Sequence, residues 1–124
     1  MPPEPLAEPP GATAPHPEPA RLEHMRAAAE EAAGLLRAIG SPYRLMILCL
    51  LVDSEKTVTE ISDAIGARQS LTSQHLTRLR LDGLVKSERR GHYNYYSLND
   101  TVAREIVEIL YRHYCAPGAK TGGG

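Results

Sequence analysis

The chain has 124 residues, enough for one small domain, and its formal net charge of −1 at pH 7 excludes a strongly basic protein. Its longest uninterrupted apolar run is the eight residues Leu45–Val52, which excludes a membrane span because about 20 apolar residues are needed to cross a bilayer. The N-terminus has no basic region followed by an apolar stretch. We therefore expect a cytoplasmic protein, in a compartment where thiols are normally kept reduced.

Both ends of the chain are predicted to lie outside the folded domain. Eight of the ten prolines fall between Pro2 and Pro19, a segment without helical or strand periodicity. Such a segment buries too little apolar surface to offset the entropy of ordering it, so residues 1–20 are predicted to be a disordered tail. Residues 117–124 are predicted to be a flexible tail. The remaining 21–116 form a domain small enough to favour burial of further apolar surface against a second copy.

Two helices are predicted in the first half of this domain. The first spans about residues 22–39, where apolar side chains recur at the spacing of one helical face. After Gly40, Ser41 and Pro42 start the second helix, as a capping hydroxyl followed by a proline at the first helical position. This helix runs to about Val52 and is apolar almost all round, so we expect it at the centre of the core.

Two short helices joined by a tight turn are predicted next. A capping box at Thr57 and Glu60 opens the first of them, and Gly66 ends it. Ser70 is expected to cap the second, which ends near Asp82. This is the plan of a helix-turn-helix, whose second helix enters the major groove of DNA.

The second of these short helices is expected to present polar side chains on its outer face. Amide side chains pair with adenine, hydroxyls pair with several bases, and arginine contacts guanine or phosphate. An exposed helix also carries polar side chains simply because water solvates them, so the pattern alone does not decide the function. The residues expected to contact DNA from this helix are Gln69, Ser70, Thr72, Ser73, Gln74 and Arg78.

A β-hairpin with a basic tip is predicted after the helix-turn-helix. Its strands are residues 84–88 and 93–98, and a last helix, capped by Asn99 or Asp100, runs to about Tyr114. The fold class is therefore mainly α with a small β-hairpin (α+β), a winged helix-turn-helix of order α-α-α-α-β-β-α. The residues of the wing expected to contact DNA are Arg89, Arg90, His92 and Tyr93.

Basic side chains concentrate between Gly66 and Tyr93. Six basic and two acidic residues give this segment a local charge of +4 (6 − 2), although the whole chain is slightly acidic. A basic surface favours phosphate contact, and a solvated charged face would explain it equally well on its own. The hairpin tip beside the helix-turn-helix favours DNA, because both elements then face one duplex. The six basic residues are Arg68, Arg78, Arg80, Lys86, Arg89 and Arg90.

Four segments between residues 35 and 98 resemble the ArsR/SmtB family of repressors. The resemblance implies a homodimer, formed through the first and last helices, that binds an inverted repeat in double-stranded operator DNA until an inducer releases it. The segments are Ala38-Ile39-Gly40-Ser41-Pro42-Tyr43-Arg44-Leu45, Ser70-Leu71-Thr72-Ser73-Gln74-His75-Leu76, Leu81-Asp82-Gly83-Leu84-Val85 and Gly91-His92-Tyr93-Asn94-Tyr95-Tyr96-Ser97-Leu98.

The metal sites known from that family are not retained here. The arsenic-type site needs two cysteines at the start of the third helix, where this chain has Thr57-Val58-Thr59. Zinc requires four nitrogen, sulfur or oxygen donors, and two of the four aligned positions in the last helix cannot ligate. No metal and no cofactor are therefore expected. The aligned positions are Asp100, Val102, His113 and Ala116.

Two cysteines remain as candidate sensing residues. Cys49 lies in the second helix, where it also fits simple burial in the core. Cys115 lies at the end of the last helix, where Arg112 and His113 favour its thiolate. A cysteine at this place in each of these helices resembles the dithiol branch of the family, typified by SqrR and BigR. That resemblance implies that persulfides or sulfide convert the pair into a disulfide or polysulfide crosslink, which relieves repression; it leaves open which cysteine attacks and which resolves.

Other functions remain compatible with the sequence. The same cysteine pair suits a repressor that senses peroxide or general thiol stress, and it suits a metalloid sensor only if His113 or a second subunit adds a ligand. A winged helix that binds protein instead of DNA is a further alternative. An enzyme is not expected, because the chain has no glycine-rich phosphate loop and no nucleophile beside a general base.

Overall fold

The computed structural model describes residues 18–118. Residues 1–17 of the predicted disordered tail (1–20) and residues 119–124 of the predicted flexible tail (117–124) lie outside the described residues. Within these residues, 18–32 belong to one compact unit and 33–118 belong to another. The core, the hairpin and the candidate sites all belong to the second unit.

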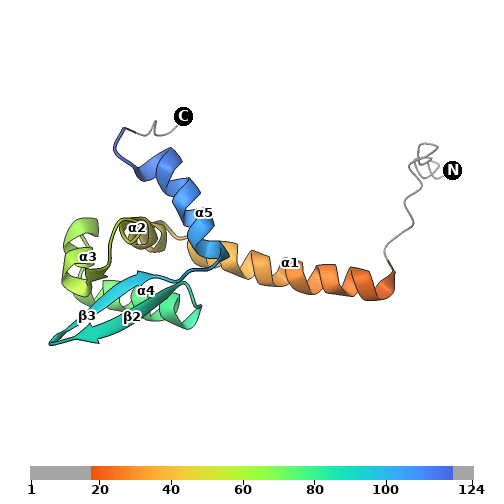
Figure 1. The fold of residues 1–124 in the computed structure, drawn as a ribbon, viewed down its shortest axis with the longest axis horizontal. Helices are drawn as coiled ribbons and strands as arrows, with labels where there is room; N and C mark the ends of the chain where they lie inside the picture. Colours follow the sequence, from red (N-terminus) through yellow and green to blue (C-terminus); the bar gives the residue numbers. More distant parts are fainter. Residues whose placement is uncertain (1–17, 119–124) are drawn as a thin grey trace. The chain divides into compact units, whose positions relative to one another are not determined.

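The predicted mainly helical α+β fold with a hairpin is confirmed, and one short strand is added to the predicted order (Figure 1). The strand β1 was missed because two residues carry no periodicity of their own. In chain order the elements are α1 (Pro19–Ile39), α2 (Pro42–Leu50), β1 (Lys56–Thr57), α3 (Val58–Ile65), α4 (Gln69–Leu81), β2 (Val85–Arg90), β3 (Tyr93–Leu98), α5 (Val102–Leu110) and the π-helical turn η1 (Tyr111–Cys115).

Three helix ends agree with the local chemistry of the sequence. Ser41 caps α2 by accepting a hydrogen bond at Oγ from the backbone nitrogen of Arg44, at 3.4 Å. Thr57 and Glu60 form the predicted capping box of α3, with hydrogen bonds of 3.2 and 2.8 Å. Gly66 ends α3 with φ +69°, a backbone conformation that favours glycine. All three predictions are confirmed.

Other helix boundaries were predicted wrongly. The helix α1 begins at Pro19, inside the predicted tail, because proline is tolerated in a first helical turn. Ser70 does not cap α4: the helix already begins at Gln69, and Arg68 occupies the cap position without a side-chain hydrogen bond.

The last helix is also capped differently from the prediction. Thr101 occupies the N-cap of α5 and makes no side-chain hydrogen bond there. Asn99 instead donates from Nδ2 to the carbonyl oxygens of Gly83, at 2.8 Å, and Val85, at 3.3 Å. Its amide therefore joins the end of β3 to the start of β2.

The three strands form one antiparallel sheet in the order β1-β3-β2. Val85 pairs with Leu98 and Arg90 pairs with Tyr93, so β2 extends to Arg90, two residues beyond its predicted end. The turn of the wing is therefore only Gly91 and His92, and Gly91 has φ +64°. Arg89 and Arg90 are strand residues rather than loop residues, and the sheet directs their side chains.

The helix α2 lies at the centre of the core, as predicted. Ile47 and Leu48 are fully buried, and α2 contacts α3, α4 and α5. Leu76 and Leu79 of α4 and Val107 of α5 are also fully buried in this core. The position of α4 is therefore determined by its apolar face.

No single helix within residues 18–118 has the length and apolar composition of a membrane span. Only the sharply bent pair of α1 and α2 together meets that test, by length and composition alone.

Replacing Leu76 with alanine tests the core. Leu76 is fully buried, so Leu76→Ala is expected to lower the free energy of unfolding by about 2–5 kcal/mol. Leu81 lies on the same helix with 76% of its surface exposed, so Leu81→Ala should change stability by less than about 0.5 kcal/mol. Urea unfolding followed by circular dichroism measures both; similar losses would contradict this packing.

Candidate nucleic-acid interface and dithiol site

Five of the six side chains predicted on the outer face of α4 are exposed. Thr72 is the exception and corrects the prediction: it is fully buried, and its hydroxyl donates to the carbonyl oxygen of Arg68 at 3.0 Å. Thr72, Leu76 and Leu79 follow one another at helical spacing along the buried face. This spacing is visible in the sequence and could have placed Thr72 on the buried face. The exposed residues are Gln69, Ser70, Ser73, Gln74 and Arg78.

Two of these exposed side chains already contact their own chain. Gln69 donates from Nε2 to Thr59 Oγ1 at 3.1 Å and so connects the first turns of α3 and α4. Arg78 lies 3.4 Å from a carboxylate oxygen of Asp82 but keeps 68% of its side chain exposed. Ser70, Ser73 and Gln74 make no side-chain hydrogen bond to any residue of the described chain, 18–118. Their polar groups are therefore open to a partner.

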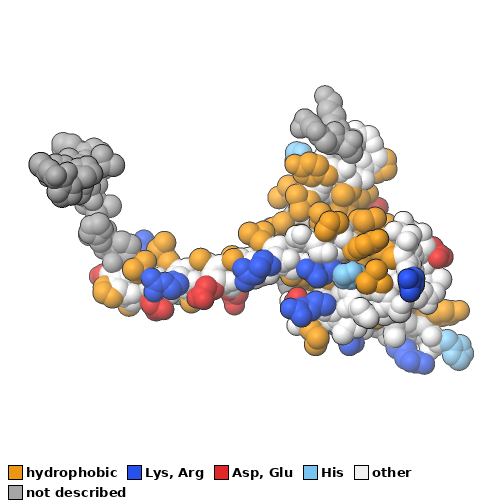
Figure 2. All heavy atoms as spheres, turned by 180° about the vertical axis from the view of Figure 1, so that it is seen from behind, with side chains coloured by type: hydrophobic (Ala, Val, Ile, Leu, Met, Phe, Trp, Pro, Cys, Tyr) orange, Lys and Arg blue, Asp and Glu red, His pale blue; other side chains and the backbone are white. Residues whose placement is uncertain are grey.

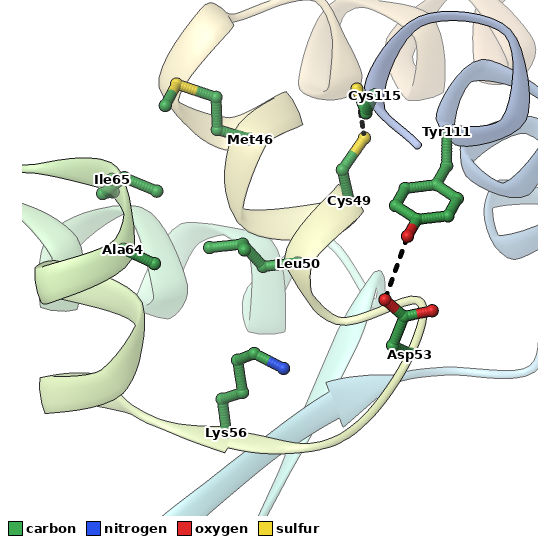
Figure 3. Close-up of a pocket in the computed structure, with 9 residues that line it drawn as sticks. All are labelled: Met46, Cys49, Leu50, Asp53, Lys56, Ala64, Ile65, Tyr111 and Cys115. Carbon is green, nitrogen blue, oxygen red and sulfur yellow. Dashed lines mark hydrogen bonds between the residues drawn. The ribbon is translucent and has the colours of Figure 1, made fainter. Parts of the chain in front are cut away.

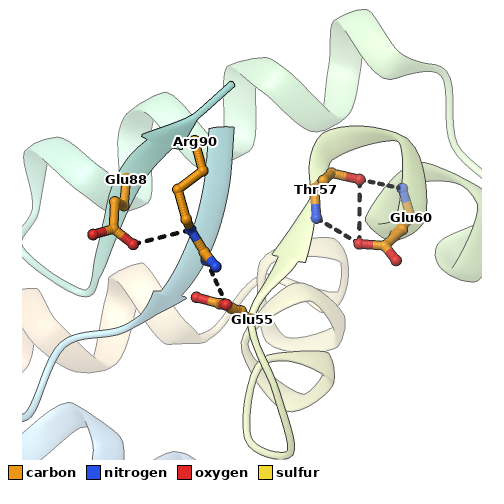
Figure 4. Close-up of polar contacts among 5 residues, drawn as sticks. All are labelled: Glu55, Thr57, Glu60, Glu88 and Arg90. Carbon is orange, nitrogen blue, oxygen red and sulfur yellow. Dashed lines mark hydrogen bonds and ion pairs between the residues drawn. The ribbon is translucent and has the colours of Figure 1, made fainter. Parts of the chain in front are cut away.

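The two arginines of the wing differ in their ion pairing. Arg90 forms ion pairs with Glu55 and, at 3.1 Å, with Glu88 (Figure 4). Its guanidinium also lies 4.1 Å from the centre of the Tyr95 ring. The hydrogen bond to Glu55 raises the pKa of Arg90 above its ordinary value. Two carboxylates therefore already balance this cation.

Arg89 differs because it pairs with no carboxylate among residues 18–118. It is exposed, and its Nε donates to the Gly91 carbonyl oxygen at 3.3 Å. His92 and Tyr93 beside it are also exposed. Figure 2 shows arginine or lysine side chains gathered with histidine at the tip of the hairpin. Arg89 therefore supplies the free positive charge of the tip.

The structure brings the two cysteines together. Cys49, in α2, is 5% exposed, and Cys115, in η1, is exposed. Their Sγ atoms are 3.3 Å apart, with the Cys115 thiol donating to Cys49. Burial, the hydrogen bond with Cys115 and the charge of Cys115, in that order, raise the pKa of Cys49 to about 12. The two thiols are thus close together but unequal in their exposure to solvent.

A cavity of about 360 Å³ opens beside the two sulfur atoms. Figure 3 shows the cysteines on one side of it and Lys56 on the other. At its edge the Tyr111 hydroxyl donates to Asp53 Oδ2 at 3.0 Å, and this bond raises the pKa of Tyr111 above its ordinary value. The lining residues are Met46, Cys49, Leu50, Asp53, Lys56, Ala64, Ile65, Tyr111 and Cys115.

Asp53 and Tyr111 were missed in the sequence because they are 58 residues apart and share no motif. The π-helical turn was missed as well, since the last helix was predicted to continue regularly to Tyr114. Within residues 18–118, no group of three or more histidine, cysteine, aspartate or glutamate side chains is arranged to hold a metal ion.

The sequence matches the bacterial regulatory proteins of the arsR family over residues 41–87, which contain the whole helix-turn-helix. The transcriptional activator HlyU of Vibrio cholerae is 39% identical over 97 residues, which cover 78% of this chain and 90% of HlyU. The chain belongs to the ArsR family. It is a DNA-binding transcription regulator, and its named relatives in this family are regulators and not enzymes.

Solved structures of ArsR-family proteins share the fold. Reduced HlyU from Vibrio cholerae superimposes with a TM-score of 0.72 at 38% identity, covering 76% of this chain and 99% of that one. The transcriptional repressor BigR from Xylella fastidiosa gives a TM-score of 0.72 at 36% identity, covering 81% and 99%. The homodimeric winged helix-turn-helix DNA-binding domain of Mb0332 from Mycobacterium bovis gives 0.62 at 28% identity, covering 68% and 79%. The winged helix-turn-helix prediction is confirmed.

The two arginines of the wing are expected to contribute unequally to DNA binding by this ArsR-family regulator. Arg89→Gln should lower the slope of log affinity against log salt by about 1, the contribution of one phosphate contact. Arg90→Gln should change the slope less, because Glu55 and Glu88 already balance that charge. Fluorescence anisotropy with labelled DNA from upstream of the regulator's own gene measures both slopes; equal losses would contradict the assignment.

The two thiols should also differ in their reaction with iodoacetamide. At pH 8 we expect Cys115 to be alkylated at least about 10-fold faster than Cys49, since only the thiolate reacts and Cys49 is buried with a pKa of about 12. The Cys49 rate should keep rising as the pH approaches 12. Peptide mass spectrometry at timed intervals measures both rates. Faster alkylation of Cys49 would contradict the difference in accessibility between the two thiols.

Proposed function

We propose that this regulator is a homodimeric repressor of double-stranded operator DNA with an inverted repeat, and that reactive sulfur species release it by crosslinking Cys49 to Cys115. The observation that carries the proposal is the 3.3 Å contact between two free thiols from segments 66 residues apart. The names of two relatives support it: BigR is described as a transcriptional repressor and HlyU as reduced.

The exposure of Cys115 makes it the first nucleophile. Its thiolate attacks the outer sulfur of a persulfide RSSH, a bond forms between Cys115 Sγ and that sulfur, and RS⁻ leaves to become the thiol RSH. Cys49 then loses its proton to solvent and attacks Cys115 Sγ, which expels the outer sulfur as hydrosulfide. In total, two thiols and RSSH give one disulfide, RSH and H₂S, so the persulfide is the oxidant.

The pKa of Cys49 explains this order of events. Two of the three causes that raise it come from the Cys115 thiol and its charge, and both change once Cys115 carries an added sulfur. Burial, the largest cause, remains. Cys49 therefore becomes a better nucleophile only after Cys115 has reacted, which suits a resolving residue.

The cavity allows a longer bridge than a disulfide. Both cysteines line this cavity of about 360 Å³, so it offers space for added sulfur atoms. With a second persulfide, two thiols and two RSSH give a trisulfide, two RSH and one H₂S. A tetrasulfide needs one further RSSH and releases one further RSH.

Exposed apolar side chains support a dimer. On α5 and the turn after it, Val102, Ile109 and Tyr114 are 61, 48 and 56% exposed. Figure 2 shows hydrophobic side chains gathered along this part of the chain. The helix α1 exposes Leu22, Met25 and Leu36. Such surfaces on a small domain are typical of protein interfaces, and the related Mb0332 domain is described as homodimeric.

The crosslink is positioned to alter the spacing of the DNA-reading helices. A symmetric dimer must hold them about 34–36 Å apart to enter successive major grooves. Cys49 lies on α2, where Tyr43 also stacks on His75 of α4, with ring centres 6.0 Å apart. Cys115 follows α5, the proposed dimer helix. A bridge between them therefore joins the DNA-reading unit to the dimer interface.

Peroxide sensing is the second candidate, and the same 3.3 Å contact favours it. A peroxide would oxidise Cys115 to a sulfenic acid with loss of water, and Cys49 would displace a second water to form a plain disulfide. The mass of the crosslinked peptide separates the two functions, since only a persulfide can add sulfur atoms between the cysteines.

The proposal is tested by DNA affinity before and after treatment with glutathione persulfide. The crosslink is expected to weaken binding by about 5- to 150-fold, a typical allosteric coupling of 1–3 kcal/mol. Cys49→Ser and Cys115→Ser should bind DNA like the reduced protein and lose the response. A double serine variant that still releases DNA would refute the proposal, and hydrogen peroxide in parallel distinguishes the second candidate.

A further inference from the structure

We propose that Tyr111 is a positioning residue for crosslink closure: its hydroxyl holds the end of the chain in the helical register that brings Cys115 onto Cys49. This inference rests on the proposed function, because it concerns the reaction of the same two thiols. It assigns a role to the hydrogen bond between Tyr111 and Asp53 and to the π-helical turn.

The register of the last turn decides which residue faces α2. Val107 of α5 is fully buried, and in a regular α-helix the residue on the same face about two turns later is the seventh, Tyr114. In the structure Tyr114 is 56% exposed, and Cys115, the eighth residue, meets Cys49. The end of the chain is therefore shifted by one residue from a regular helix.

The π-helical turn supplies this shift. The backbone nitrogen of Ala116 donates to the carbonyl oxygen of Tyr111 at 2.7 Å, five residues back instead of the four of an α-helix. One extra residue is thus accommodated within the turn. π-helical turns are rare, so we expect a tertiary contact to stabilise this register. They also occur frequently at functional sites.

The hydrogen bond from Tyr111 to Asp53 is that contact. Tyr111 is the first residue of the π-helical turn, and Asp53 lies three residues after α2, the helix that carries Cys49. The bond of 3.0 Å therefore joins the two segments that bear the sulfur atoms. Across residues 18–118, the thiol contact itself is the only other side-chain hydrogen bond between these segments.

Loss of this bond favours the regular α-helical register. The cysteine then turns away from Cys49 and Tyr114 takes its place on the inner face. Closure of the crosslink requires the register to change first, so the equilibrium constant for closure falls with the fraction of molecules in the π-helical register.

Tyr111→Phe removes the hydroxyl and keeps the ring. The protein is equilibrated in glutathione redox buffers, and the Cys49–Cys115 disulfide is quantified by mass spectrometry. We expect the equilibrium constant for closure to fall by about three- to tenfold, the size of one net hydrogen bond. This corresponds to a reduction potential about 15–30 mV less negative.

Two control variants separate positioning from general damage to the fold. Tyr114→Phe removes a hydroxyl from an exposed neighbour in the same turn and should leave the reduction potential unchanged. Asp53→Asn keeps a side-chain oxygen that accepts the bond from Tyr111, so its effect should be smaller than that of Tyr111→Phe. Circular dichroism confirms that each variant is folded.

Deletion of Arg112 provides a rescue. It removes one exposed residue from the π-helical turn, so the cysteine becomes the seventh residue after Val107 and faces α2 in a regular α-helix. In the Tyr111→Phe background this deletion should restore closure toward the wild-type equilibrium constant. A merely structural role of the hydroxyl predicts no such rescue.

The outcomes distinguish this inference from the proposed function. If Tyr111→Phe closes its crosslink with the wild-type equilibrium constant, Tyr111 has no positioning role, while persulfide-dependent release of DNA by the wild type would still support the proposed function. If the wild-type cysteines form no crosslink in any redox buffer, both are overturned. If Tyr111→Phe is unfolded, Asp53→Ala, which removes the acceptor of the Tyr111 hydrogen bond, decides: an unchanged reduction potential overturns the inference.

Discussion

The contact between Cys49 and Cys115 joins α2, which lies at the centre of the core, to the π-helical turn that follows α5. Ile47 and Leu48, the two residues before Cys49, are fully buried, so α2 cannot move without displacing its neighbours. Close-packed interiors transmit such displacement because they contain few voids. A displacement of α2 caused by a chemical change at the sulfur atoms is therefore transmitted to α4 and α5, which contact α2.

The short segment after α2 contacts both the thiol site and the wing. Asp53 accepts the hydrogen bond from Tyr111, and two residues later Glu55 pairs with Arg90 of β2. Lys56 then lines the cavity and pairs with Tyr96 in the sheet. One segment thus contacts both the thiol site and the hairpin, so a rearrangement at one site has a direct structural route to the other.

The chemistry of the site depends on the inequality of its thiols. Two exposed thiols would react independently with any oxidant, and two buried ones would react with none. Here Cys49 is buried in α2, while the π-helical turn leaves Cys115 exposed with its sulfur 3.3 Å from that of Cys49. This arrangement favours an ordered reaction at Cys115 followed by closure within the chain.

Much of the fold was predictable because its signals are local. Ser41 before Pro42 and the Thr57–Glu60 capping box each act within one turn, and the confirmed helix ends follow from them. The strand β1 has no such signal, since its two residues become a strand only by pairing with Tyr95 and Tyr96 of β3. The five exposed polar residues of α4 were placed correctly, but Thr72 was not. Its polar side chain favoured a surface position, whereas its place along the helix, in line with Leu76 and Leu79, puts it in the core.

The sequence by itself determined the helix-turn-helix, the basic hairpin and the choice of two cysteines as candidates, because caps, periodicity, composition and family resemblance are all carried by neighbouring residues. Only the tertiary structure decided that Glu55 and Glu88 balance Arg90, that Asp53 binds Tyr111 and that the cysteines meet in unequal environments. Most of these properties depend on contacts between segments distant in the chain. A shift of one residue in the last helix, which no local pattern specifies, decides which side chain faces Cys49.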